Sequence, residues 1–229
     1  MLAILAPALA CGAEPIDWKL TYTHHRTEDE RDGIDLNLRG SRDARVFWLG
    51  HYWRSNEFQQ SRAGLEQSLS YDWGKLLLSA QAATRGFVGL ASQAEIGSGG
   101  VRLLAGFGRT NLKPYYNLNF DPNDAVTLGL AVDLPAGMHA SFFAVHDDRL
   151  DTGQTVLHAV LRTSEGPAQR WTVDAFQRRG PSGDGGERVR RTGLGITYDR
   201  APYFARIVFD PNANFSGHDM WRLGFGGRF

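Results

Sequence analysis

Apolar and polar residues alternate with a period of two along most of the chain. The stretch from Ile16 to Thr23 alternates strictly, and the same pattern recurs in residues 33–40, 61–71 and 220–229. Successive side chains of a β-strand point to opposite faces, so this alternation predicts strands with one apolar and one polar face. No stretch shows a convincing run of apolar residues at helical spacing. The sequence therefore predicts an all-β fold.

Turn residues divide the pattern into about fourteen segments. They lie near residues 16–25, 33–40, 44–54, 61–71, 75–86, 88–96, 101–110, 125–134, 138–147, 154–163, 169–178, 189–198, 203–210 and 220–229. The sixth segment has the weakest pattern, so about twelve strands is the alternative count. Short turns exchange with longer polar loops along the chain, which predicts a meander of hairpins with tight turns at one end and loops at the other. An even number of strands returns both termini to the tight-turn end.

Alternation alone is compatible with a soluble β-sandwich and with a membrane barrel, which differ in what the apolar face meets. Aromatic residues cluster at segment ends, as the girdles at two bilayer interfaces require. They are Trp18, Tyr22, Trp48, Tyr52, Trp53, Tyr71, Trp73, Tyr115, Tyr116, Trp171, Tyr198, Tyr203, Phe204, Trp221 and Phe229. Glycines recur on the polar faces, where they relieve crowding inside a closed sheet: Gly106, Gly108, Gly129, Gly193, Gly195, Gly224 and Gly226. Both features favour the barrel.

The last segment adds a sequence signature. In Met220 to Phe229, Trp221, Leu223, Phe225 and Phe229 share one face, and the chain ends on an aromatic residue. These ten residues resemble the C-terminal strand of Gram-negative outer-membrane β-barrels, whose terminal Phe is an assembly signal. The resemblance implies a closed antiparallel up-and-down transmembrane β-barrel in the outer membrane, and it gives Phe229 the role of a signal to the barrel-assembly machinery. Closure fits the bilayer, because an open sheet edge would leave backbone groups unpaired in hydrocarbon.

Residues 1–13 form an apolar run that ends in small residues and is too short to span a bilayer. We interpret this segment as a secretory signal peptide, cleaved after Ala10 or Ala13, although it has no basic residue ahead of the apolar run. Acylation of Cys11, as in a lipoprotein, is the alternative. Residues 14–229 then form the barrel domain. Cleavage after Ala13 leaves a chain without cysteine, so no disulfide supports the fold.

Composition excludes several classes. The 25 basic and 25 acidic residues cancel, which argues against a dedicated nucleic-acid binder. A hydrophobic fraction of 42% and a mean hydropathy of −0.34 argue against a bundle of membrane helices. They do not argue against a membrane barrel, because lipid-facing and lumen-facing residues average to an ordinary hydropathy. The sequence carries no Walker loop, dinucleotide fingerprint or zinc-ligand spacing, so we expect no cofactor and no metal.

The predicted lumen contains more arginine than carboxylate. The arginines on polar faces are Arg39, Arg62, Arg85, Arg102, Arg162, Arg178, Arg191, Arg206, Arg222 and Arg228. If carboxylates pair with all of them, they form a rigid network that fills a narrow barrel. If some remain unpaired, they favour anionic solutes in a channel. The leading hypothesis is thus a porin-like small-solute channel or a structural barrel, with membrane lipid, lipopolysaccharide and small anionic solutes as partners.

The longest loop, 109–124, and a partial echo at 209–215 both contain the sequence Phe-Asp-Pro-Asn. This tetrapeptide is favourable turn chemistry. A functional interpretation places oxygen ligands for a divalent cation, or sugar contacts, around the outer mouth. The mouth residues in question are Asn111, Tyr115, Tyr116, Asn119, Asp121, Asp124, Asp210 and Asn212.

An enzymatic function is the main alternative. His146, Asp147 and Asp148 follow one another at the end of the ninth segment, where a His beside carboxylates could act as a general base for an outer-membrane lipid hydrolase or acyl-modifying enzyme. No nucleophile stands out and no GxSxG motif is present, so we favour a non-enzymatic barrel. A soluble exported sandwich that binds ligands through its loops is the third hypothesis.

Overall fold

The computed structural model describes residues 15–30, 32–55, 57–97, 99–113, 115–118, 120–164, 166, 168–183 and 187–229. The predicted export segment 1–13, with Cys11, lies outside them. The described chain forms fourteen strands and two short 3-10 helices. In order these are β1 (Asp17–Thr27), β2 (Gly33–Arg42), β3 (Arg45–Arg54), β4 (Phe58–Tyr71), β5 (Gly74–Ala83), β6 (Phe87–Ile96), β7 (Val101–Thr110), β8 (Ala125–Leu134), η1 (Pro135–Gly137), β9 (Met138–Asp147), β10 (Thr155–Ser164), β11 (Gln169–Pro181), β12 (Arg188–Arg200), β13 (Tyr203–Asp210), η2 (Ala213–Phe215) and β14 (Met220–Arg228).

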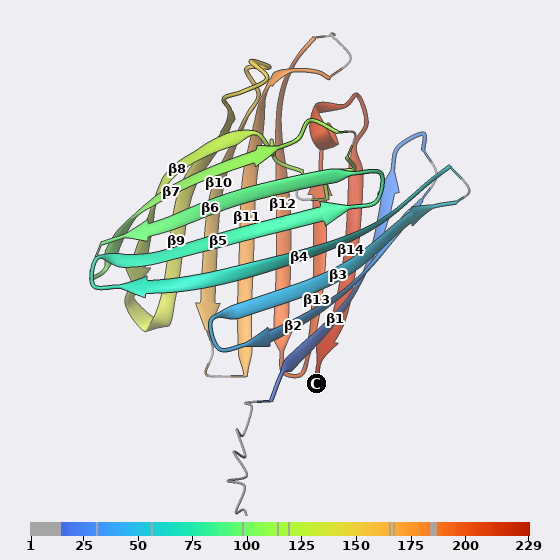
Figure 1. Cartoon of the computed structure of the whole chain (residues 1–229). Coiled ribbons are helices and arrows are strands. Elements are labelled where there is room, and N and C mark those ends of the chain that lie inside the picture. Colours follow the sequence, from blue (N-terminus) through green and yellow to red (C-terminus); the bar gives the residue numbers. More distant parts are fainter. Residues whose placement is uncertain are drawn as a thin grey trace, which may run out of the picture.

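The strands form one closed antiparallel barrel (Figure 1). Each strand pairs with its neighbours in the chain, and β1 closes the sheet against β14, with Lys19 opposite Arg228 and Thr27 opposite Met220. The prediction of a fourteen-stranded barrel is confirmed, including β6, whose pattern was the weakest. The soluble sandwich is not the fold of this chain, because there is a single sheet without an open edge.

The two ends of the barrel differ. At one end β1 begins, β14 ends and the connections are short; the other end carries the longer loops, including the connection between β7 and β8 (Figure 1). In bacterial outer-membrane barrels the short turns face the periplasm and the long loops face outward. The loop end is therefore the outer end of this barrel.

The outer surface of the barrel is apolar. Leucines and aromatic residues project from the sheet, with Leu49, Leu90, Leu128 and Phe142 each about 60% exposed. A continuous apolar surface of this kind is too large for water-facing protein and suits the hydrocarbon of a bilayer. Within the described residues, no helix has the length and apolar character needed to cross a membrane.

Aromatic pairs lie on the outer surface near both ends. Trp171 packs on Tyr198 with ring centroids 4.4 Å apart at the short-turn end, and Phe209 packs on Trp221 at 4.8 Å at the loop end. These pairs fit the predicted girdles. Tyr71 and Trp73 stack in the turn between β4 and β5.

Five of the residues predicted for the girdles lie inside the barrel instead: Trp48, Tyr52 and Phe204 on strands, and Tyr115 and Tyr116 in the β7–β8 loop. On β3, Phe47 and Leu49 are exposed on the outer surface, whereas Trp48 lines the interior cavity and Tyr52 is buried. The prediction was wrong here because β3 has bulky side chains on both faces, so residue type alone does not identify the lipid-facing side.

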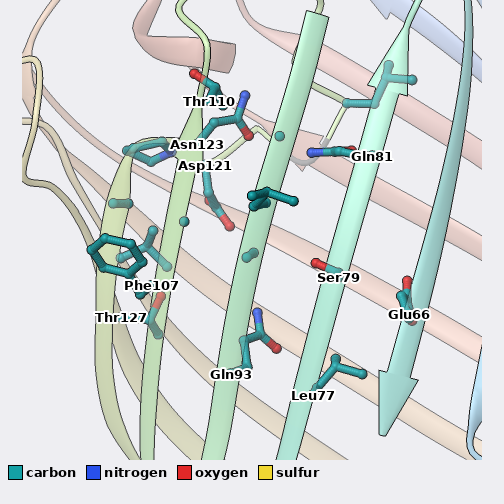
Figure 2. A pocket seen from close by; sticks show the side chains of 18 of the residues that line it. Glu66, Leu77, Ser79, Gln81, Gln93, Phe107, Thr110, Asp121, Asn123 and Thr127 are labelled. Carbon is teal, nitrogen blue, oxygen red and sulfur yellow. The ribbon is translucent and has the colours of Figure 1, made fainter.

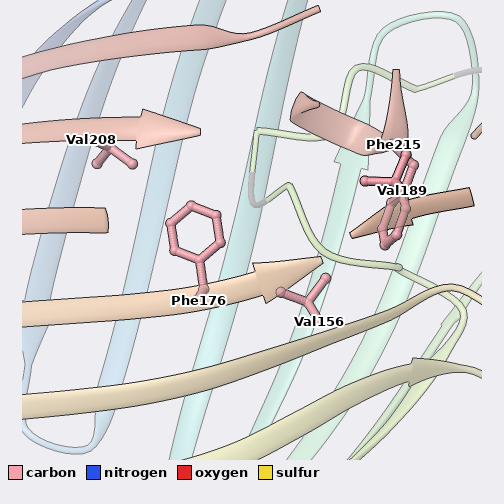
Figure 3. Close-up of a cluster of buried hydrophobic side chains, with 5 residues drawn as sticks. All are labelled: Val156, Phe176, Val189, Val208 and Phe215. Atoms are coloured by element: carbon pink, nitrogen blue, oxygen red, sulfur yellow. The ribbon is translucent and has the colours of Figure 1, made fainter. Parts of the chain in front are cut away.

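A compact apolar cluster fills the lumen at the loop ends of β10 to β13. It consists of Val156, Phe176, Val189, Val208 and Phe215, all buried, with Phe215 contributed by η2 (Figure 3). Full burial of each such side chain contributes roughly 1.5–3 kcal/mol. The cluster narrows the outer mouth on this side and leaves the interior open toward the opposite wall.

Candidate functional site

The interior of the barrel encloses a cavity of about 660 Å³. Small and amide side chains of β5 to β8 form one wall, and Figure 2 shows Ser79, Gln81 and Gln93 on this wall with Asp121 of the β7–β8 loop nearby. Charged side chains line much of the remaining interior surface. The described arginines that face the cavity from β2, β4, β11, β13 and β14 are Arg39, Arg62, Arg178, Arg206 and Arg222, and the acidic lining residues are Glu66, Asp121 and Asp174.

Several inward arginines are paired with carboxylates that lie one or two strands away. Arg39 donates to Glu66 at 2.5 Å, and the buried Arg62 donates to Asp35 at 2.8 Å. Nearer the short-turn end, Arg102 donates to Asp133 at 2.6 Å. These pairs account for part of the predicted excess of arginine, because each carboxylate neutralises a guanidinium that would otherwise be unpaired inside the barrel.

The side chains of three inward arginines make no hydrogen bond and no ion pair within the described chain. Arg206 is exposed and lines the cavity, and Arg162 and Arg191 are exposed at inward positions of β10 and β12. Asp174 and Asp210 are the carboxylates near Arg206, and neither forms an ion pair with it. The lumen therefore combines a paired network with a few cations that remain open to solution.

Arg85, also predicted for the lumen wall, lies in the turn between β5 and β6 with a positive φ of 72°. Its guanidinium sits 5.3 Å above the ring of Phe58, at the outer mouth.

The loop between β7 and β8 folds into the outer mouth. Tyr115 stacks on Phe87 with ring centroids 3.8 Å apart, and Tyr116 stacks on Tyr52 at 4.3 Å. Burial raises the pKa of both loop phenols above the ordinary tyrosine value. Phe120 is 1% exposed and packs with Ala213 and Met220. The loop thus forms the outer boundary of the cavity.

A buried ionic cluster anchors this loop. Asp210, fully buried, accepts hydrogen bonds from Arg178 at 3.0 and 3.1 Å and from Arg222 at 3.0 Å. Arg178 also donates to the carbonyl oxygen of Phe120 at 2.5 Å, and the Arg222 guanidinium lies 3.9 Å above the Phe120 ring. The two arginines therefore connect the barrel wall to the tip of the loop.

His158 provides a second attachment. Its Nδ1 lies 3.0 Å from Asp174 on the neighbouring strand β11, and its Nε2 lies 3.4 Å from Asp121 of the loop. Its ring stacks on Phe143 with centroids 4.6 Å apart. A protonated imidazole would bridge both carboxylates.

Glycines make room for the inward aromatic rings. A Cβ on Gly64 would lie 2.3 Å from the Trp48 ring, and a Cβ on Gly193 would lie 2.3 Å from the Phe176 ring. These rings lie against the wall of the neighbouring strand, where a side chain would push them into the lumen. Glycines thus relieve crowding inside the barrel, as predicted, and the rings they accommodate are those of Trp48 and Phe176.

The remaining predicted mouth residues that are described form hydrogen bonds that stabilise the loops. Asn111 bonds the backbone of Gly86 and Val88, Asp124 accepts from Thr110 and Arg149, and Asn212 donates to the Ser216 carbonyl. Asn119 lies outside the described residues. In the part of the chain that is described, no group of three or more His, Cys, Asp and Glu side chains is arranged to hold a metal ion.

The candidate catalytic residues are not brought together. His146 lies on the outer surface and bonds Thr155 at 2.7 Å, whereas Asp147, on the opposite face of β9, is buried and accepts from the backbone of Arg149, Leu150 and Thr152. Asp148 pairs with Arg109, whose hydrogen bond lowers the pKa of this loop carboxyl. Strand alternation therefore separates the histidine from its nearest carboxylate.

Sequence reasoning missed the cavity-facing Trp48, the aromatic side chains that hold the loop, and the anchoring role of Arg178. Only the aromatic content of an otherwise polar loop (Tyr115, Tyr116, Phe120) signalled that the loop packs inward.

No family model matches the chain, and no curated protein matches it in sequence. Among solved structures, the chain is similar to the outer membrane protein Omp33 of Acinetobacter baumannii, with a TM-score of 0.62 over 93% of this chain and 98% of that one at 12% identity. The KdgM porin, solved in complex with disordered oligogalacturonate, aligns at 6% identity with a TM-score of 0.48 over 92% and 99%. A triple mutant of the Rhodopseudomonas blastica porin aligns at 12% identity with a TM-score of 0.47 over 94% and 99%. The match to Omp33 shows that this chain has the fold of an outer-membrane β-barrel.

Proposed function

We propose that this chain forms a channel in the outer membrane of a Gram-negative bacterium and passes small anionic solutes. The observation that carries the proposal is Arg206, a cation that lines the interior cavity without an ion pair in the described chain. An unpaired guanidinium on the wall of a pore raises the local concentration of anions and lowers that of cations.

The rest of the wall supports the same selectivity. Arg39 and Arg62 are neutralised by Glu66 and Asp35, so they add little net field. The small and amide side chains of the facing wall, such as Ser79 and Gln93, offer hydrogen bonds without charge. An anion can therefore exchange part of its hydration for contacts on both walls.

The β7–β8 loop limits the size of the solute. Tyr115 and Asp121 line the cavity from the loop, and Phe120 closes the side next to Met220. Arg178 and Arg222 hold the loop in this position through their contacts with Phe120. This arrangement favours small organic or inorganic anions over polymers.

The same proposal includes how the protein reaches and occupies the membrane. Residues 1–13 act as the export signal, Phe229 as the signal to the barrel-assembly machinery, and the apolar outer surface contacts membrane lipid and lipopolysaccharide. Deletion of Phe229 should reduce the amount of heat-modifiable barrel in the outer membrane.

Planar-bilayer recording tests the function. The full chain should give stepwise conductance with a reversal potential on the anion-selective side in a salt gradient. Arg206→Gln should lower the anion-to-cation permeability ratio about tenfold, since one charge at about 6 Å in water favours an anion by about 0.7 kcal/mol and disfavours a cation by the same amount. Arg200→Gln, an outward arginine at the short-turn end, is the matched control and should leave the ratio unchanged.

Silence from a barrel that still shows heat-modifiable migration would reject the channel and leave a structural barrel. Cation selectivity, or equal selectivity of the Arg206→Gln variant and the wild type, would reject the role of Arg206.

A further inference from the structure

Two arginines lie directly opposite each other on the outer surface of β11 and β12. Arg179 and Arg190 are register partners, and both are exposed. Neither forms an ion pair with a carboxylate of the described chain. Like charges on directly opposed positions of an antiparallel pair repel, so this arrangement destabilises the sheet unless an anion lies between them.

The outward cross-strand row next to the pair, toward the short-turn end, is polar and consists of Gln177 and Thr192. Arg179 donates through Nε to Gln177 at 2.5 Å, and Gln177 donates to Thr192 at 3.2 Å. The terminal nitrogens of both guanidinium groups are left for another acceptor. Toward the short-turn end, the following cross-strand rows are apolar or aromatic: Ala175 with Leu194, Val173 with Ile196, and Trp171 with Tyr198.

The position of the pair matches an outer membrane interface. Trp171 belongs to the aromatic pair near the short-turn end, and Arg179 lies eight residues further along β11. At about 3.3 Å per residue, this separation is roughly 26 Å along the strand, or about 20 Å of height at a strand tilt of about 35–45°, which brings Arg179 near the outer edge of an apolar band about 25 Å tall. Arg179 and Arg190 therefore lie at the level of the lipid headgroups at the outer end.

We propose that Arg179 and Arg190 bind the phosphate of a lipid A headgroup in the outer leaflet. Two guanidinium groups on one face present several N–H donors to a single phosphate, which is the geometry that makes arginine an effective phosphate ligand. A phosphate between the two guanidinium groups removes their mutual repulsion, while the acyl chains of the same lipid A molecule lie along the rows that contain Leu194 and Ile196. That continuity with the lipid-facing surface favours a lipid over free phosphate.

The test uses the full-length folded chain in non-ionic detergent, titrated with bisphosphorylated lipid A and followed by native mass spectrometry. The double variant Arg179→Gln/Arg190→Gln should bind lipid A about tenfold more weakly or worse, because two charge-assisted contacts are lost. The control Arg45→Gln/Arg200→Gln removes two outward arginines at the short-turn end and should bind as the wild type does. Dephosphorylated lipid A should bind the wild type as weakly as the double variant binds lipid A, and inorganic phosphate should not compete.

A single substitution gives an independent readout. Arg190→Gln should raise the unfolding temperature in detergent alone, because it removes the repulsion, and lower it relative to wild type when lipid A is present. Arg179→Lys/Arg190→Lys keeps both charges and should retain most of the affinity, which separates a lost charge from a misfolded barrel. Equal lipid A affinity of wild type and the double Gln variant, or competition by inorganic phosphate, would overturn the proposal.

Discussion

The ionic cluster under the β7–β8 loop offers the sharpest test of what holds the outer mouth together. In Asp210→Asn, Arg178 and Arg222 remain buried but lose the only carboxylate that they share in the described chain. Asp210 has no exposed surface and accepts three hydrogen bonds of 3.0 to 3.1 Å from the two arginines. Removing one partner of a buried ion pair costs about 3–5 kcal/mol, because the remaining charge is left uncompensated. We expect a loss of that size in the free energy of unfolding.

Asp199 provides a control, because it also joins two arginines, but the side chains of these arginines are partly exposed. It accepts from Arg228 at 2.5 Å and from Arg170 at 3.1 Å, and these arginine side chains are 37% and 43% exposed. Water can solvate these two guanidinium groups when the carboxylate is lost, and pairs at exposed sites contribute only about 0–1 kcal/mol, so Asp199→Asn should destabilise the barrel less than Asp210→Asn does. The assay is urea unfolding in lipid vesicles, followed by tryptophan fluorescence and heat-modifiable migration.

A third variant separates stability from the attachment of the loop. Replacing Arg178 and Arg222 by Met and Asp210 by Leu removes the charges and keeps the volume, so the barrel should recover most of the lost stability. Phe120 nevertheless loses its anchoring arginines, and conductance should become larger or noisier. Equal urea midpoints for Asp210→Asn and Asp199→Asn would refute the argument from burial, and an unchanged conductance in the triple variant would refute the anchoring role.

Two further predictions follow from single contacts. Gly64→Ala should push the Trp48 ring into the cavity, lowering conductance and destabilising the barrel by about 1–3 kcal/mol, whereas Gly224→Ala, whose Cβ meets its nearest neighbour at 3.4 Å, should be tolerated in both assays. Asp148, whose pKa is lowered by Arg109, should stabilise the native state at neutral pH and lose this contribution as the pH falls below about 3.9 and then through the native pKa. The difference in urea midpoint between wild type and Asp148→Asn should therefore vanish in acid, and a constant difference across pH would contradict it.

The strands could be predicted from the sequence because each residue of a barrel strand faces either lipid or lumen. Charged side chains are unfavourable in lipid, and large apolar side chains are uncommon in the lumen. Apolar and polar residues therefore alternate along each strand. Even β6 follows this rule, with Val88 and Leu90 exposed outward and Gly89 facing inward. The rule failed at Trp48, where an aromatic ring packs in the lumen against a glycine of the next strand.

For the lumen, the sequence predicted which kinds of residues face inward but not how they pair. An excess of arginine on the polar faces was readable, but pairing depends on which carboxylate lies across the barrel wall. Glu66 neutralises Arg39 because β2 and β4 flank β3 closely enough for the two side chains to meet. Arg206 has no such partner on its neighbours. The distinction between a rigid network and an ion path therefore lies in the register of the strands, and the barrel contains both.

The repeated Phe-Asp-Pro-Asn sequence shows where local chemistry stops being informative. In the copy at 209–212, Phe209 is fixed on the outer surface against Trp221, and strand alternation turns Asp210 inward to Arg178 and Arg222. In the copy at 120–123, no strand fixes the faces, and Phe120 is buried with its carbonyl oxygen on the same Arg178. Both copies supply turns, yet they meet at one arginine only because the barrel closes and the β7–β8 loop folds back into it. The outer boundary of the cavity thus forms only when the barrel closes, so it could not be predicted from any single segment of the chain.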